Sequence, residues 1–102
     1  MLTYEIIQKR LEDVFKLVGY NVEVNDPRNH EYDLNQGEVN IALLKYFQTG
    51  KRLEIHLNLG NGNNGKLESI IEGLKPRLNG HFNPVIINPD KNTHHLAKSE
   101  LQ

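Results

Sequence analysis

The sequence contains no cysteine, has only four prolines in 102 residues, and carries no long apolar run. The absence of cysteine excludes a disulfide scaffold, a thiolate zinc site and a cysteine nucleophile. No stretch approaches membrane-spanning length, and residues 1–5 lack the basic and apolar regions of a signal peptide. We therefore expect a single small domain in the cytoplasm, without a membrane segment.

A large excess of one sign of charge is also missing, because the net charge is −1. No global field recruits nucleic acid or a membrane surface, so neither is an expected partner. The charges are uneven along the chain: residues 1–40 hold eight acidic and four basic side chains, and residues 41–102 hold five and eight. The acidic N-terminal part suits a basic partner.

The N-terminal half begins with a clear helical pattern. Thr3 is suited to cap a helix that runs to Val18, and Gly19 is suited to end it. Residues 20–25 then alternate apolar and polar, which predicts a short strand. Residues 28–37 show no period and predict a long surface loop.

A β-hairpin from Val39 to Leu59, turning at Gly50, is the central structural prediction. Residues 52–59 alternate strictly, whereas residues 39–47 are apolar on both faces, so two registers compete. One has a two-residue Thr49-Gly50 turn, and the other has a three-residue loop from Gln48 to Gly50. We favour the second register. Its predicted core face consists of Val39, Ile41, Leu43, Leu53, Ile55, Leu57 and Leu59.

The C-terminal half predicts a second helix and a last strand. Apolar residues from Leu67 to Leu78 recur at helical spacing, and Pro76 should end or kink that helix near Leu74. Residues 85–87 lie between prolines, which predicts an edge strand. The expected fold is α+β, in the order helix-strand-strand-strand-helix-strand, with a mainly antiparallel sheet and both helices on one face. We expect residues 1–89 to form the domain and residues 90–102 to form a polar tail, with a short helix in the tail as an alternative.

In the favoured register, the outer face of the hairpin mixes aromatic, apolar and charged groups, as protein interfaces do. The candidate binding residues are Leu44, Tyr46, Arg52, Glu54 and His56. Together with the acidic N-terminal part, they favour a small binding module that occludes a protein partner. Bacterial immunity and anti-defence proteins, whose partners are toxins or nucleases, act in this way. Self-association is left open, and no catalytic residue is assigned under this hypothesis.

The element order also resembles the core of the PD-(D/E)xK nuclease family, which gives an alternative function. That resemblance implies a metal-activated water held by carboxylates on two strands and one helix. The matching positions are Glu54 and His56 on the third strand, Asp33 or Glu38 near the second, and Glu5 or Glu12 on the first helix. His56 stands where the family has lysine, and no proline precedes either second-strand acid.

A glycine-rich loop gives a third hypothesis, a nucleotide or phosphate binder. Gly60, Gly62 and Gly65 satisfy G-x-G-x-x-G, and Lys66 follows them. Leu67 stands where a P-loop needs a hydroxyl, and the preceding strand alternates instead of being apolar on both sides. The adjacent pair His94-His95 lacks the spacing of metal ligands on one helical face. We therefore expect no metal and no cofactor.

Overall fold

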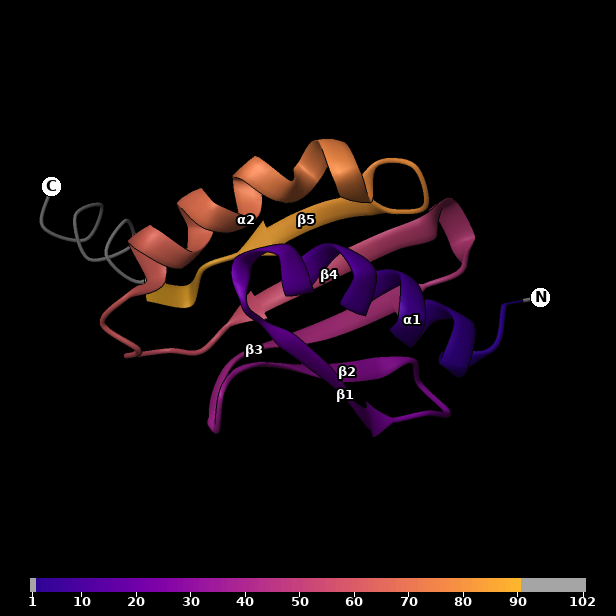
Figure 1. Cartoon of the computed structure of the whole chain (residues 1–102), viewed down its shortest axis with the longest axis horizontal. Helices are drawn as coiled ribbons and strands as arrows, with labels where there is room; N and C mark the ends of the chain where they lie inside the picture. The colour runs from indigo at the N-terminus through magenta and orange to yellow at the C-terminus, as the bar shows by residue number, and fades with distance from the viewer. Residues whose placement is uncertain (1, 91–102) are drawn as a thin grey trace, which may run out of the picture.

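Two helices lie on one side of a five-stranded sheet (Figure 1) in the computed structural model, which describes residues 2–90. The elements in chain order are α1 (Tyr4–Phe15), η1 (Lys16–Val18), β1 (Asn21–Asp26), β2 (Glu31–Gln36), β3 (Val39–Phe47), η2 (Thr49–Lys51), β4 (Arg52–Leu57), α2 (Asn64–Leu78) and β5 (Asn83–Ile87). Apart from Asp90, the predicted tail 90–102 lies outside the described residues, and so does the pair His94-His95.

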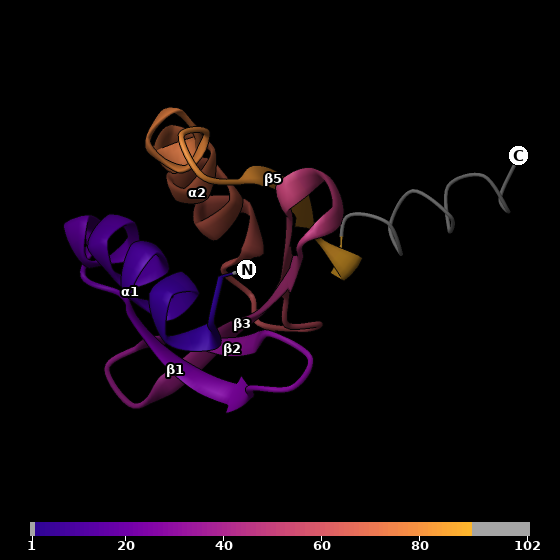
Figure 2. The same cartoon turned by 90° about the vertical axis from the view of Figure 1, so that its right-hand side faces the viewer.

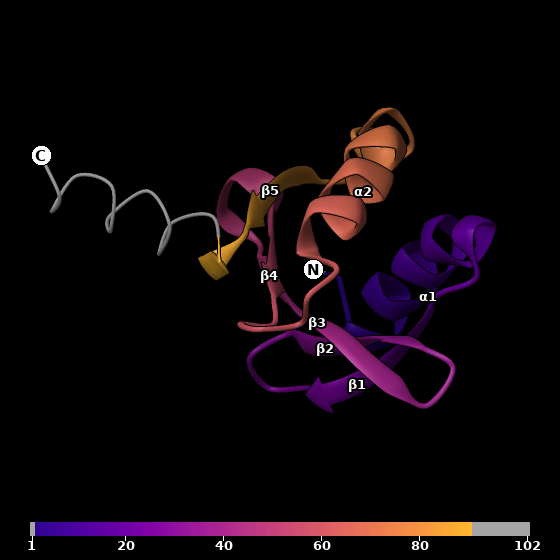
Figure 3. The same cartoon turned by 90° about the vertical axis from the view of Figure 1, so that its left-hand side faces the viewer.

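The strands follow one another across the sheet in the order β1-β2-β3-β4-β5. The first four pair antiparallel, and β5 pairs parallel with β4. A parallel return needs a long crossover, which α2 supplies. Side views show both helices over the same face of the sheet (Figure 2 and Figure 3). The predicted α+β class, central hairpin and one-sided helices are therefore confirmed.

Helix α1 has the predicted ends. The Thr3 hydroxyl accepts a hydrogen bond from the Ile6 N–H at 3.3 Å, which satisfies one of the free donors of the first turn. The last turn tightens into the 3₁₀ helix η1, and Gly19 closes it with φ +82° in the left-handed region. Strand β1 follows at Asn21, so the helix to Val18 and the first strand are both confirmed.

The predicted loop over residues 28–37 is wrong, because most of it is strand β2. A tight turn precedes this strand, in which the Asp26 carboxylate accepts hydrogen bonds from the Arg28 N–H at 3.1 Å and from Asn29 Nδ2 at 2.8 Å. Tyr32 and Leu34 are fully buried in β2. Only two large apolar residues alternate here, so the period was too short to distinguish from a loop.

The β3–β4 hairpin turns at Gly50 as predicted, with φ +72°, but its register differs by one residue from the favoured one. The observed pairs are Ala42 with Leu57, Leu43 with His56, Leu44 with Ile55, Lys45 with Glu54, Tyr46 with Leu53 and Phe47 with Arg52. This is the register of the two-residue Thr49-Gly50 alternative. A shift by one residue turns every β3 side chain to the other side of the sheet.

Packing explains the observed register of the hairpin. The favoured register would have placed Lys45 beside Leu53 in the core, whereas the observed one buries Leu44 and Tyr46 beneath the helices. A bulge between β2 and β3 at Ile41 keeps that residue buried as well, as predicted. The other predicted core residues of the hairpin differ in burial. Leu53, Ile55 and Leu57 are buried, whereas Leu43 is half-buried and Val39 and Leu59 are exposed.

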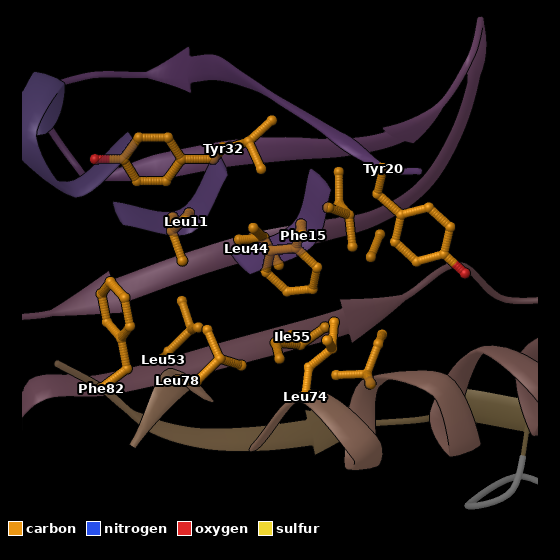
Figure 4. Close-up of a cluster of buried hydrophobic side chains, with 14 of the residues drawn as sticks. Leu11, Phe15, Tyr20, Tyr32, Leu44, Leu53, Ile55, Leu74, Leu78 and Phe82 are labelled. Atoms are coloured by element: carbon orange, nitrogen blue, oxygen red, sulfur yellow. The ribbon is translucent and has the colours of Figure 1, made fainter. Parts of the chain in front are cut away.

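Helix α2 continues past Pro76 to Leu78, so of the two predicted outcomes, an end or a kink near Leu74, the end is wrong. Leu78 is fully buried, and its packing offsets the hydrogen bond that proline cannot make. Figure 4 shows Leu78 beside Leu53 and Leu74 beside Ile55, with Leu44 of the hairpin near the Phe15 ring. Strand β5 lies at the edge of the sheet, as its prolines predicted.

Neighbouring leucines on β3 test the register. We expect Leu44→Ala to lower the free energy of unfolding by about 2–5 kcal/mol, because it leaves a cavity in the core. Leu43→Ala should cost less than about 1.5 kcal/mol, because that side chain is half-buried on the other face. Equilibrium urea unfolding measures both values. A larger loss for Leu43→Ala than for Leu44→Ala would contradict the observed register.

Candidate functional site

The side of the sheet opposite the helices is the candidate site, and we call it the open face. Within residues 2–90, α1 and α2 both cover the other side (Figure 2 and Figure 3). Strand alternation and the observed registers assign its side chains. They are Asn21, Glu23, Asn25, Asp26, Glu31, Asp33, Asn35, Asn40, Leu43, Lys45, Phe47, Arg52, Glu54, His56, Asn83, Val85 and Ile87.

Three of the five predicted binding residues lie on the open face and two do not. Arg52, Glu54 and His56 project from β4 as predicted, since the alternation of that strand is independent of the hairpin register. Leu44 and Tyr46 are buried under the helices, so their predicted exposure is wrong. Leu43 and Phe47 take their places beside the β4 residues.

Arg52, Glu54 and His56 form one connected group along β4. The Glu54 carboxylate accepts a hydrogen bond from Arg52 Nε at 2.8 Å through one oxygen and pairs with His56 Nε2 at 2.9 Å through the other. The hydrogen bonds from Arg52 and then His56 lower the pKa of Glu54 below its ordinary value. The group is therefore a preformed polar centre whose carboxylate stays ionised at neutral pH.

Apolar side chains surround this polar centre. Leu43 lies opposite His56 on β3, and Ile87 lies opposite it on β5. Phe47 lies opposite Arg52, and 45% of its surface is exposed. A phenylalanine and a guanidinium side by side on an uncovered surface are typical of the central residues of protein interfaces.

The charges on the open face are unbalanced. Its acidic side chains are Glu23, Asp26, Glu31, Asp33 and Glu54, and its basic side chains are Lys45 and Arg52. Lys45 lies between Glu31 and Glu54 on the neighbouring strands, so an acidic residue flanks it on each side. The acidic excess is concentrated on β1 and β2, the strands farthest from Arg52.

A row of asparagines closes one end of the open face, and the sequence pattern gave no sign of it. Asn58 Nδ2 donates to Asn40 Oδ1 at 2.9 Å, and Asn40 Nδ2 donates to Asn35 Oδ1 at 3.0 Å. Asn58 lies 18 residues from Asn40 in the sequence, and the strand registers bring these amides together. The row links β2, β3 and the end of β4 through side chains.

The residues of the nuclease hypothesis are only partly brought together. Glu54 and His56 are neighbours, but Asp33 lies two strands away with Leu43 between, and Glu38 lies in the β2–β3 turn. Glu5 and Glu12 belong to α1, on the other side of the sheet. Among the described residues, no three histidine or acidic side chains are grouped in a way that could hold a metal ion.

The Asp90 carboxylate holds the glycine-rich loop in place. Asp90 accepts hydrogen bonds from the Gly60 N–H through one oxygen and from Asn64 Nδ2 through the other, both at 2.9 Å. Gly60 and Gly62 adopt left-handed φ values that glycine tolerates. Gly65 and Lys66 form the first turn of α2 and are exposed. Asp90 thus places a negative charge near the helix N-terminus, where a phosphate would bind.

Comparison of the chain with protein-family models, with curated proteins and with solved structures finds no match. Over residues 2–90, neither helix is both long enough and apolar enough to cross a membrane.

The Asp90 contacts give a stability prediction. Asp90→Asn keeps the shape of the side chain but removes its charge and one acceptor, so we expect a loss of about 1–2 kcal/mol in the free energy of unfolding. Asp13→Asn is the matched control, because it breaks only exposed pairs with Lys9 and Lys16 and should cost clearly less than Asp90→Asn. Urea unfolding of the three proteins compares them, and equal losses would contradict the assigned contacts.

The lowered pKa of Glu54 predicts a dependence of stability on pH. A carboxyl group with a lower pKa in the folded state stabilises the fold above its unfolded pKa, which is near 4.5. That contribution is lost as the pH falls through the folded value. Glu54→Gln should therefore lose less stability than the wild type when the pH is lowered from 6 towards 2, as measured by urea unfolding at each pH. Parallel acid profiles would refute the assignment.

Proposed function

We propose that this protein is a small binding module that docks its open face on a basic surface of a protein partner and occludes it. The observation that carries the proposal is a sheet face, uncovered within the described residues, on which exposed Phe47 and half-buried Leu43 adjoin the Arg52–Glu54–His56 group. Inhibitors of the immunity or anti-defence kind work by such occlusion. Their partners are toxins or nucleases with basic substrate-binding surfaces.

The size of the face supports a protein partner. Five strands spaced by about 4.8 Å, each about 20 Å long, present a projected area of about 400 Å² before side-chain relief is counted. A standard interface buries about 800 Å² on each partner. At about half of that area, the sheet alone is large enough to supply the core of such an interface, and Leu43 lies on the central strand β3, where binding energy is usually concentrated.

The charge pattern supports a basic partner over nucleic acid. Five carboxylates against two cations give the face an acidic excess of three, whereas α1 carries three acidic and two basic side chains. An acidic face attracts a basic protein surface and speeds its association. The same field repels a phosphate backbone, whose binding depends on clustered lysine and arginine.

Phe47→Asp tests the proposal, with Ile6→Asp as its matched control. Phe47 is 45% exposed on the open face and Ile6 is 43% exposed on α1, so both changes replace a similar apolar surface with a carboxylate. Partners captured by cross-linking in the source cells would be purified and their dissociation constants measured by biolayer interferometry. We expect Phe47→Asp to weaken binding by about tenfold or more and Ile6→Asp to leave it within about twofold.

Two further measurements, the salt dependence of binding and the nuclease activity of the protein, test the proposal against its alternative. Binding to a basic partner should weaken as salt is raised, because screening shortens the reach of the carboxylates. Equal binding by wild type and Phe47→Asp would overturn the docking face. Cleavage of DNA or RNA by the purified protein with Mg²⁺, lost in Glu54→Ala, would favour the nuclease alternative instead.

A further inference from the structure

We propose that His56 makes docking at the open face depend on pH, so that binding of a basic surface weakens as the pH falls from 7.5 to 5.5. This inference rests on the proposed function and adds a form of regulation to it. Histidine is the side chain that ordinarily changes its charge in this range. His56 lies within the described binding surface, with its side chain 30% exposed.

Residues of β3, β4 and β5 surround His56. On β4 itself, Glu54 Oε1 lies 2.9 Å from His56 Nε2, and Arg52 pairs with the other Glu54 oxygen. Leu43 lies directly opposite on β3, with Lys45 diagonal to it. On β5 the directly opposite residue is Ile87. Asp33 on β2 is separated from His56 by Leu43.

These contacts mean that Glu54 is the one carboxylate of the described residues that touches His56, and Arg52 shares it. The positive charge of a protonated His56 is therefore added to that of Arg52, and no second acid beside His56 offsets it. Because the Arg52 and His56 hydrogen bonds lower the pKa of Glu54, its carboxylate stays ionised while the imidazole gains its proton. The added charge remains on the surface that the partner meets.

Protonation changes the balance of the whole face. Five carboxylates face two cations when His56 is neutral, and three cations when it is protonated, so the acidic excess falls from three to two. Attraction of a basic surface falls accordingly, since nearby charges on the same face act on the partner together. The hydrogen bond between Glu54 and the imidazole is compatible with both charge states, so the face need not rearrange.

A fluorescent lysine homopolymer is the probe for this effect. Lysine stays charged between pH 5.5 and 7.5, so a change in affinity comes from the protein. Anisotropy titrations at both pH values give the ratio of dissociation constants for each variant. For the wild type we expect binding to weaken by about three- to tenfold at pH 5.5. His56→Gln, which retains an N–H donor for Glu54, should bring this ratio to within about twofold of unity.

His81→Gln is the matched control, because His81 is an exposed histidine in the turn before β5 and lies outside the open face. It should keep the wild-type ratio. An NMR titration of the His56 ring in the free protein tests the protonation step without any ligand. A ratio that His56→Gln leaves unchanged, or a ring that does not titrate between pH 5.5 and 7.5, would overturn the role of His56. Absence of homopolymer binding at pH 7.5, or binding that Phe47→Asp and Ile6→Asp alter equally, would instead refute the docking face.

Discussion

The burial of Leu44 opposite Ile55, with Lys45 held outside, is the constraint on which the remaining structure depends. Strand β3 is apolar on both sides, so hydrophobic pattern alone does not choose its register. Moving the lysine ammonium into the core would cost several kcal/mol. Leaving part of Leu43 exposed costs only about 1–2 kcal/mol. The unfavourable burial of one charge therefore decides which residues of β3 meet the helices.

This constraint also explains what the sequence could predict. Helix α1, strand β4 and edge strand β5 each have a local signal: a capped helical stripe, strict alternation, and prolines on both sides. Strand β2 and the hairpin register have none that is sufficient alone. Tyr32 and Leu34 become recognisable as strand residues only when β1 and β3 lie on either side of them, and the β3 faces separate only when the helices cover one. In the candidate site, the alternation of β4 predicted its exposed residues correctly. The prediction for β3 named the residues of the wrong face, because the register was not determined by pattern alone.

The edges of the sheet are less available for contacts than its face. On β1, Gln8 Nε2 donates to the Val22 carbonyl at 3.2 Å, so a side chain already occupies an acceptor of that strand. On β5, Pro84 has no N–H to offer a further strand. Both features are ways in which proteins prevent additional strands from pairing at an edge. They favour contacts through side chains on the open face over extension of the sheet.

Strand β3 places an apolar and aromatic strip on the open face whichever register the hairpin adopts. An ordinary half-exposed strand directs polar residues outward, yet β3 directs Leu43 and Phe47 outward beside His56 and Arg52. The other register would have exposed Leu44 and Tyr46 in their place, so either arrangement leaves an apolar and aromatic strip next to the charged residues of β4. Such a strip contributes little to the stability of the isolated domain, because water still reaches it. Its energetic contribution is gained only when another surface covers it, which is the physical reason for assigning binding to this side of the sheet.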